Sequence, residues 1–158
     1  MKILGKIIVG ILVCFLLVLL VLRITGLDPK GLRPGLWLRG NLVTTPVTDW
    51  SFANMQTIQL QTRTWYLLPH SVNIECVVYN GHLYVSSVHY RPGATYRWNN
   101  DVLRDPHVRI RIGNKLYDRT LSHVTDPAEK AGVMAAKYKD PKRLSPNLTS
   151  NVFRVSDD

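Results

Sequence analysis

The sequence has few of the residues that build disulfide frameworks or metal sites. Two cysteines occur in 158 residues. Cys14 lies in an apolar run and Cys76 in a predicted strand, so an intramolecular disulfide is not expected and the redox compartment stays open. The five histidines are dispersed, without the C-x-x-C or H-x-x-x-H spacing of a zinc site. The sequence therefore predicts no metal centre.

Acidic residues are scarce relative to basic ones. The chain has 11 Asp and Glu against 20 Lys and Arg, for a formal net charge of +9. Such a surface suits anionic lipid headgroups or a phosphate-bearing ligand. No DNA- or RNA-binding module is recognisable, so nucleic acid is not the expected partner. No nucleophile elbow, P-loop or H-E-x-x-H motif occurs, so the catalytic residues stay unknown.

One long apolar run stands near the start of the chain. Residues 7–22 read IIVGILVCFLLVLLVL, two lysines precede the run and Arg23 ends it. With the apolar residues just before it, the run is long enough for a helix that crosses a bilayer. We therefore expect residues 1–25 to form a single-pass transmembrane anchor that places the protein at a membrane.

A cleaved signal peptide is the alternative interpretation of this run. A small-x-small cleavage site would be expected after it, but residues 23–26 read RITG. A lipoprotein site at Cys14 would need a small residue in front, where Val13 stands. We therefore favour an uncleaved anchor. Basic residues flank it on both sides, so the membrane side stays open, with a preference for a cytoplasmic N-terminus and an external domain.

The rest of the chain is long enough for one domain with a core. Residues 26–56 are rich in Gly and Pro and are expected to form an irregular lead-in, with its aromatic residues packing on the core or a loop. Residues 57–158 form the predicted domain. Alternating apolar residues predict strands at 57–62, 71–79, 82–90, 108–112 and 115–123, with an edge strand at 152–155.

Turn and cap residues support this order of elements. Asn80-Gly81 is typical of a tight hairpin turn between two strands. Asp126-Pro127, with Glu129 after it, is typical of a helix start, and this helix is expected to run to about Tyr138. A shorter helix is predicted at 98–103. Mostly antiparallel strands with two helices indicate a mainly β (α+β) fold, a small barrel with helices at its openings.

Several segments carry a more specific pattern. Residues 83–87 read LYVSS and residues 97–113 read RWNNDVLRDPHVRIRIG, followed by KLY at 115–117 and VTDPAE at 124–129. This pattern resembles the FMN/deazaflavin-binding split-barrel superfamily, in its deazaflavin-dependent nitroreductase-like and pyridoxamine-phosphate-oxidase-like branches. The resemblance covers about residues 57–140. It implies a small antiparallel split β-barrel with two helices, here preceded by one transmembrane helix.

The resemblance also implies a cofactor site. FMN or a deazaflavin would lie in a groove formed by the first strands and the following helix. The residues expected to bind it are Ser71, Asn73, Ser86, Ser87, Arg97 and Trp98, with His89 and Arg91 as further candidates.

Each of these candidates has a structural alternative. The Ser87 hydroxyl either lines the pocket or bonds to backbone. Arg97 either grips a phosphate beside the Trp98 indole or is solvated while Trp98 anchors the core. Arg109 and Arg111 are predicted to lie on a solvated barrel face, and the histidines are predicted to be surface or turn residues.

Two functions follow as hypotheses. The first is a membrane-anchored flavin- or deazaflavin-dependent oxidoreductase acting on a lipophilic acceptor such as a quinone, with the cofactor supplying the chemistry. Deazaflavin-binding members carry an Arg/Lys-Ser-Gly loop between the first two strands, whereas residues 65–69 read WYLLP. This departure supports the second hypothesis, a cofactor-free accessory or interaction subunit of a membrane complex. Besides membrane lipid, a homodimer or a larger complex is the expected partner.

Overall fold

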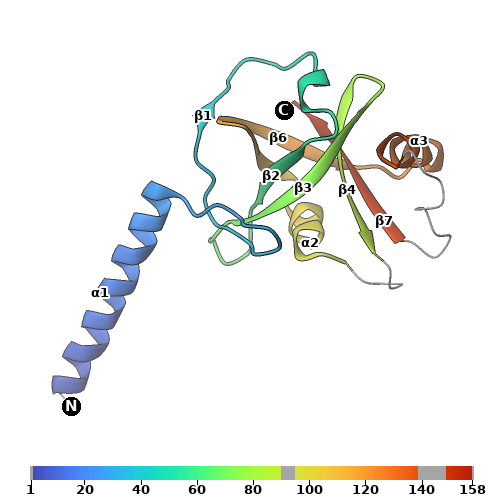
Figure 1. Cartoon of the computed structure of the whole chain (residues 1–158). Coiled ribbons are helices and arrows are strands. Elements are labelled where there is room, and N and C mark those ends of the chain that lie inside the picture. The colour runs from blue at the N-terminus through green and yellow to red at the C-terminus, as the bar shows by residue number, and fades with distance from the viewer. Residues whose placement is uncertain (1, 90–94, 139–148, 158) are drawn as a thin grey trace.

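The computed structural model describes residues 2–89, 95–138 and 149–157. A long helix, α1 (Lys2–Thr25), extends away from a β-barrel formed by the rest of the chain (Figure 1). The barrel strands are β2 (Thr57–Thr62), β3 (His70–Tyr79), β4 (His82–His89), β5 (His107–Ile112), β6 (Lys115–His123) and β7 (Thr149–Ser156). The helices after α1 are α2 (Arg97–Arg104) and α3 (Pro127–Lys137).

The six long strands close into an antiparallel barrel. Their order is β6-β5-β2-β3-β4-β7, and β7 pairs back with β6 through Leu121 and Val155, which closes the ring. The predicted fold class is therefore confirmed. One strand was not predicted: β1 (Asn41–Leu42), inside the lead-in, pairs parallel to β6. Two residues without alternation leave no pattern to recognise.

The core fills the barrel because apolar side chains alternate along each strand. Leu60, Val85, Ile110 and Phe153 are fully buried inside it. The lead-in adds Trp50, whose ring centroid lies 5.3 Å from that of Tyr117. Packing of this tryptophan on the core is as predicted, and Ala53 of the short 3-10 helix η1 (Ser51–Ala53) joins it.

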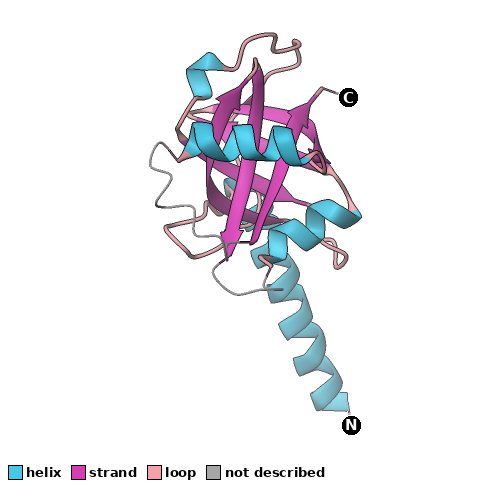
Figure 2. Cartoon of the chain, turned by 90° about the vertical axis from the view of Figure 1, so that its right-hand side faces the viewer, coloured by secondary structure: helices cyan, strands magenta, loops and turns pink. Residues whose placement is uncertain are grey.

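The two helices of the domain occupy different positions. Helix α2 inserts Trp98 and Val102 into the barrel core at one end. Helix α3 lies across the outer wall instead (Figure 2), where Val133 packs with Tyr84 and Val152. The expectation that both helices sit at barrel openings is therefore wrong for α3. The outward faces of β3, β4 and β7 are themselves apolar and need a cover.

Strand β3 changes partner near its middle, and this opens the wall. Its residues from Cys76 to Tyr79 pair with β4, whereas those from His70 to Glu75 pair with β2 alone among the barrel strands. Beyond Val85, residues Ser86–His89 of β4 pair with β7. We call the opening between residues 71–75 and 86–89 the slit.

The lead-in is fastened to the free edge of β3 beside the slit. Gly35 and Ser71 exchange two backbone hydrogen bonds of 2.8 and 3.0 Å. The Asn73 side-chain amide donates to the carbonyl oxygens of Pro29 and Gly31 at 3.3 and 3.2 Å. These contacts hold the turn 30–33 against one rim of the slit.

Helix α1 has the dimensions of a membrane span. Residues Ile3–Thr25 are long and apolar enough to cross a membrane, and none of this segment is buried. The helix continues into the lead-in without a free linker, because Gly26 donates to the Leu22 carbonyl at 2.8 Å and Leu27 donates to the Trp37 carbonyl at 3.1 Å.

Gly35→Ala is expected to loosen the lead-in. A Cβ at this position would lie 2.6 Å from both the Pro29 nitrogen and the Ser71 Oγ, and closer still to the Leu27 carbonyl oxygen. Overpacking of this kind costs ~1–3 kcal/mol of unfolding free energy. The Ser71 amide should then exchange faster with deuterium, as measured by mass spectrometry of peptides covering the start of β3.

Gly113→Ala is the matched control. Its Cβ would meet nothing within 4 Å, although its φ of 59° also disfavours alanine. This variant should lose stability through backbone strain alone and leave Ser71 protected. Equal protection of Ser71 in both variants would contradict the role given to Gly35.

Candidate functional site

The slit contains a cavity of about 480 Å³. This volume lies within the range of small-molecule sites in proteins. Its lining comes from five segments: the lead-in turn 31–33, β3, β4, the start of α2 and the end of α3. Residues from both faces of the strands contribute, so the cavity passes through the barrel wall instead of lying on its surface.

Four of the six predicted site residues line this cavity: Asn73, Ser86, Ser87 and Trp98. They come from β3, β4 and α2, which are brought together only by the fold. Trp98 serves two roles at once, since it is 5% exposed and its ring lies 5.4 Å from that of Phe153. It therefore anchors the core and presents part of its surface to the slit.

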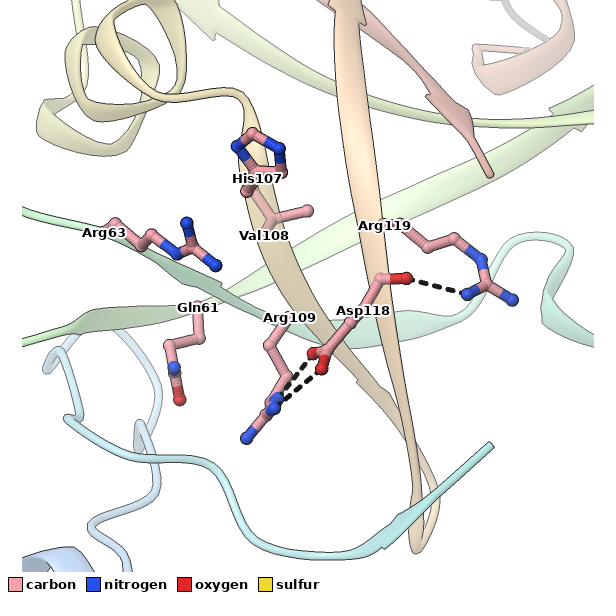
Figure 3. A pocket seen from close by; sticks show the side chains of 7 residues that line it. All are labelled: Gln61, Arg63, His107, Val108, Arg109, Asp118 and Arg119. Carbon is pink, nitrogen blue, oxygen red and sulfur yellow. Dashed lines mark hydrogen bonds and ion pairs between the residues drawn. The ribbon is translucent and has the colours of Figure 1, made fainter. Parts of the chain in front are cut away.

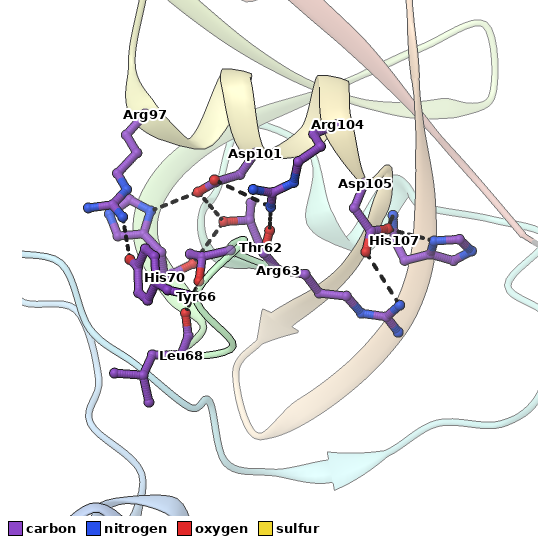
Figure 4. A network of polar contacts seen from close by, with 11 residues as sticks. Thr62, Arg63, Tyr66, Leu68, His70, Arg97, Asp101, Arg104, Asp105 and His107 are labelled. Atoms are coloured by element: carbon purple, nitrogen blue, oxygen red, sulfur yellow. Dashed lines mark hydrogen bonds and ion pairs between the residues drawn. The ribbon is translucent and has the colours of Figure 1, made fainter.

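The other two predicted residues lie away from the cavity. Ser71 is fully buried beside Gly35, and its Oγ has no hydrogen-bond partner among the described residues. Arg97 turns outward, where it donates to the Tyr66 hydroxyl and lies 5.0 Å from that ring's centroid (Figure 4). Arg91 lies outside the described residues.

Lys137 at the end of α3 is a site residue that the sequence analysis missed. Its side chain is almost fully buried, and its Nζ donates to Ser86 Oγ at 3.1 Å. The Glu75 carboxylate lies 3.6 Å from Nζ but is mostly exposed. Burial lowers the pKa of Lys137, and Glu75 opposes this shift. Lys137 follows Val133 by four residues, so both lie on the same face of the helix. This spacing could have indicated from the sequence that Lys137 faces inward with Val133.

A buried polar cluster adjoins the slit. The Asn99 amide donates to Ser87 Oγ at 2.8 Å and lies 3.4 Å from His89 Nε2. Ser87 therefore bonds to a side chain, not to backbone. His89 is 6% exposed and stacks on Tyr96, with 4.4 Å between ring centroids. The prediction of a surface histidine is wrong here, because β4 turns its end into the space beneath α2.

The burial of His89 favours a neutral imidazole. A neutral ring with an unprotonated Nε2 can accept from the Asn99 NH₂ group at 3.4 Å. Burial lowers the pKa of His89, because a protonated ring would lose its hydration there.

A second network fixes the base of α2 (Figure 4). Asp101 is 5% exposed and receives the Thr62 hydroxyl at 3.2 Å. His70 Nδ1 and Arg104 Nη2 lie 3.9 and 3.7 Å from its carboxylate. Burial lowers the pKa of His70, Arg97 adds to the shift, and Asp101 opposes it. This network positions α2, and with it Trp98 and Asn99.

The outer face of the barrel has a smaller cavity of about 180 Å³ over β2, β5 and β6 (Figure 3). Arg109 binds both oxygens of Asp118 there, at 2.6 and 2.8 Å. This contact holds the pKa of Asp118 below its usual value. Arg111 pairs with Asp28 at 2.6 Å. Both arginines face outward as predicted, and their charge is already balanced.

The described residues contain no group of three or more His, Cys, Asp or Glu side chains placed to hold a metal ion. At about 480 Å³ the slit is larger than the cavity on the outer face, and it holds the buried Lys137 cation among apolar and aromatic side chains.

No protein-family model and no curated protein sequence matches this chain. Solved structures do. A conserved hypothetical protein, Rv2991 of Mycobacterium tuberculosis, has a TM-score of 0.53 at 16% identity, covering 77% of this chain and 85% of that one. A NimC/NimA family protein of Clostridium acetobutylicum has a TM-score of 0.50 at 14% identity, covering 65% and 75%.

A third structure, described as a domain-swapped dimer, has a TM-score of 0.51 at 19% identity, covering 64% of this chain and 81% of that one. Identities this low show the fold alone. They confirm the split-barrel fold expected from the sequence.

Acid is expected to destabilise the domain through the buried histidines. The pKa of His89 is lowered in the folded state, so the unfolded chain binds a proton first as pH falls below about 6.5. Stability is thus complete above that pH and declines below it. His89→Gln should flatten this decline in melting temperature, and only in part, because the pKa of His70 is lowered too.

The exposed His82 on the hairpin provides the control. His82→Gln should keep the acid-side decline of the wild-type protein. If His89→Gln showed the same decline as His82→Gln, the neutral state assigned to His89 would be wrong.

Proposed function

We propose that this chain is a membrane-anchored oxidoreductase that binds a flavin-type cofactor, FMN or a deazaflavin, in the slit and acts on a lipophilic acceptor. The observation that carries the proposal is the buried Lys137 cation in a cavity of about 480 Å³. The split-barrel resemblance of residues 57–140 points to the same class of ligand.

The residues present fit such a group. A flavin offers a flat ring system and a negatively charged phosphate. Val72, Ile74 and Trp98 provide apolar walls for a ring. Lys137 and Ser86 provide donors for an anion. A buried ammonium is costly unless it is paired, and the mostly exposed Glu75 at 3.6 Å satisfies it only in part.

When bound, the cofactor would supply the transfer of hydride or electrons. The chain would bind and orient it. Trp98 and Ile74 would exclude water from its ring, and the amide of Asn99 would fix the direction of the Ser87 hydroxyl. Lys137 would neutralise the phosphate. Helix α1 would bring a membrane-dissolved acceptor within reach of the slit.

The phosphate contacts proposed here differ from those of the deazaflavin-binding branch. Its basic loop between the first two strands corresponds to residues 65–69, which carry no cation. Arg97, on the same side, is engaged by Tyr66. We therefore assign the anionic end of the ligand to the α3 side of the slit.

The cofactor-free hypothesis has a specific observation in its favour. Glu75 of the same chain provides Lys137 with a counter-charge at 3.6 Å. In that case the protein is an accessory subunit of a membrane complex. In either case we propose a single-pass anchor with a cytoplasmic N-terminus and an external domain. Pairing into a homodimer is part of the proposal, supported by a similar fold solved as a swapped dimer.

Titration of the detergent-purified full-length protein tests the cofactor. FMN, a phosphate-bearing deazaflavin and riboflavin are followed by absorbance and fluorescence. We expect saturable FMN binding that Lys137→Met weakens about tenfold, which is ~1.4 kcal/mol. Riboflavin lacks the phosphate, so its affinity should change little. Retained riboflavin binding also shows that the variant is folded.

Arg109→Met is the control, because its guanidinium lies on the outer face and is paired with Asp118. It should bind FMN as the wild-type protein does, and so should Arg97→Ala. No bound cofactor in the purified protein and no saturable binding of any flavin would refute the oxidoreductase proposal and leave the accessory subunit.

A further inference from the structure

Three large apolar side chains are exposed on two loops beside the slit. Trp65 is 78% exposed, Leu67 92% and Leu32 fully. Exposed single leucines are common, but a tryptophan and two leucines at the tips of neighbouring loops are not, because each costs free energy in water. Their surroundings indicate what covers them.

The two loops flank the start of β3. The turn 30–33 is closed by two backbone hydrogen bonds between Lys30 and Arg33, and the lead-in pairs with β3 through Gly35 and Ser71. The loop 63–69 leads directly into β3. Figure 1 shows both loops on the side of the barrel where α1 joins it, and in Figure 2 α1 lies below the barrel.

The loop 63–69 holds the side chains of Trp65 and Leu67 away from the domain. The Trp65 ring contacts Tyr66 edge-on at 5.4 Å, and Tyr66 is covered by Arg97 on its other side. The Thr64 hydroxyl donates to the Leu68 carbonyl across the loop. Leu67 has a φ of 68°, and its side chain is exposed to solvent.

Exposed cations stand close to these tips in the sequence. Lys30 lies two residues before Leu32, Arg33 follows it directly, and Arg63 lies two residues before Trp65. Arg23 ends α1 on the same side. Arg63 has Asp105 at 3.6 Å but is itself 66% exposed. Exposed apolar tips with cations nearby complement an anionic bilayer surface, where the apolar side chains enter the headgroup layer and the cations meet phosphate.

We propose that Leu32, Trp65 and Leu67 form a membrane-contact surface that inserts into the headgroup layer of an anionic bilayer next to α1. This inference rests on the membrane anchor proposed above. The chain carries only a few residues between Thr25 and Lys30, so the turn cannot lie far from the bilayer that α1 crosses. Tryptophan at this depth is typical of membrane interfaces.

The contact would also set the substrate class. Leu32 and Arg33 belong to the lining of the slit. The mouth of the slit therefore opens at headgroup level. Molecules with an apolar body and a polar head, which concentrate at that depth, reach it without crossing water.

Single-cysteine labelling of the full-length protein in lipid nanodiscs tests the surface. In a Cys14→Ser background, Leu32→Cys and Leu67→Cys carry an environment-sensitive fluorophore, and Cys76 is buried and stays unlabelled. Met55→Cys is the matched control, half exposed next to η1 at the far end of the barrel. We expect a blue shift and quenching by headgroup-depth spin-labelled lipid at positions 32 and 67, and neither at 55.

Lipid composition tests the role of the cations. The shift at 32 and 67 should be larger in phosphatidylcholine with phosphatidylglycerol than in phosphatidylcholine alone. Arg33→Gln with Arg63→Gln should reduce this difference, because two of the four cations that attract the anionic lipid are lost.

The outcomes separate the two proposals. Failure of the protein to enter nanodiscs would refute the anchor itself. Entry with the labels at 32 and 67 as water-exposed as that at 55 would refute the contact surface and leave the anchor and the cofactor site standing. A shift in detergent that grows with protein concentration would mean that a second copy covers the tips, which overturns the lipid assignment.

Discussion

Strand β3 hydrogen-bonds to β2 along its first half and to β4 only along its second half, and the candidate site depends on that divergence. A fully paired wall would leave no space between Asn73 and Ser86. Where the two strands separate, no inter-strand hydrogen bonds close the wall, so other segments must line the opening. The lead-in, α2 and α3 each contribute to it. The slit is thus built from segments far apart in the sequence, held by the closed barrel beneath.

Burying Lys137 in this opening has an energetic consequence. An ammonium taken from water needs compensation, and Ser86 with Glu75 provides part of it. In the proposed cofactor site, this residual demand would favour anions over neutral molecules. On the outer wall, Arg109 is satisfied by both oxygens of Asp118 and has no such preference. The two cationic positions therefore differ in how completely a counter-charge pairs them.

The strands were predictable because alternation and turn chemistry are local. Asn80-Gly81 and the Asp126 cap stand where the sequence indicated, and Asp126 accepts from the amides of Ala128 and Glu129. The candidate site was predictable only in part. Asn73, Ser86, Ser87 and Trp98 meet in the cavity, but Lys137 and His89 owe their burial to α3 and α2 packing against other elements. Such packing joins residues far apart in the sequence, so the pattern within a single strand does not predict it.

In the proposed membrane-anchored state, the junction between α1 and the lead-in would couple the barrel to the thickness of the bilayer. Gly26 and Leu27 are both hydrogen-bonded, so no free linker separates the helix from the domain. Arg39 also donates to the Arg23 carbonyl across the junction. A span that is too long for a thin membrane tilts. With no flexible linker to absorb the tilt, the whole barrel would lean with it. Membranes of different thickness would therefore present the same opening at different angles.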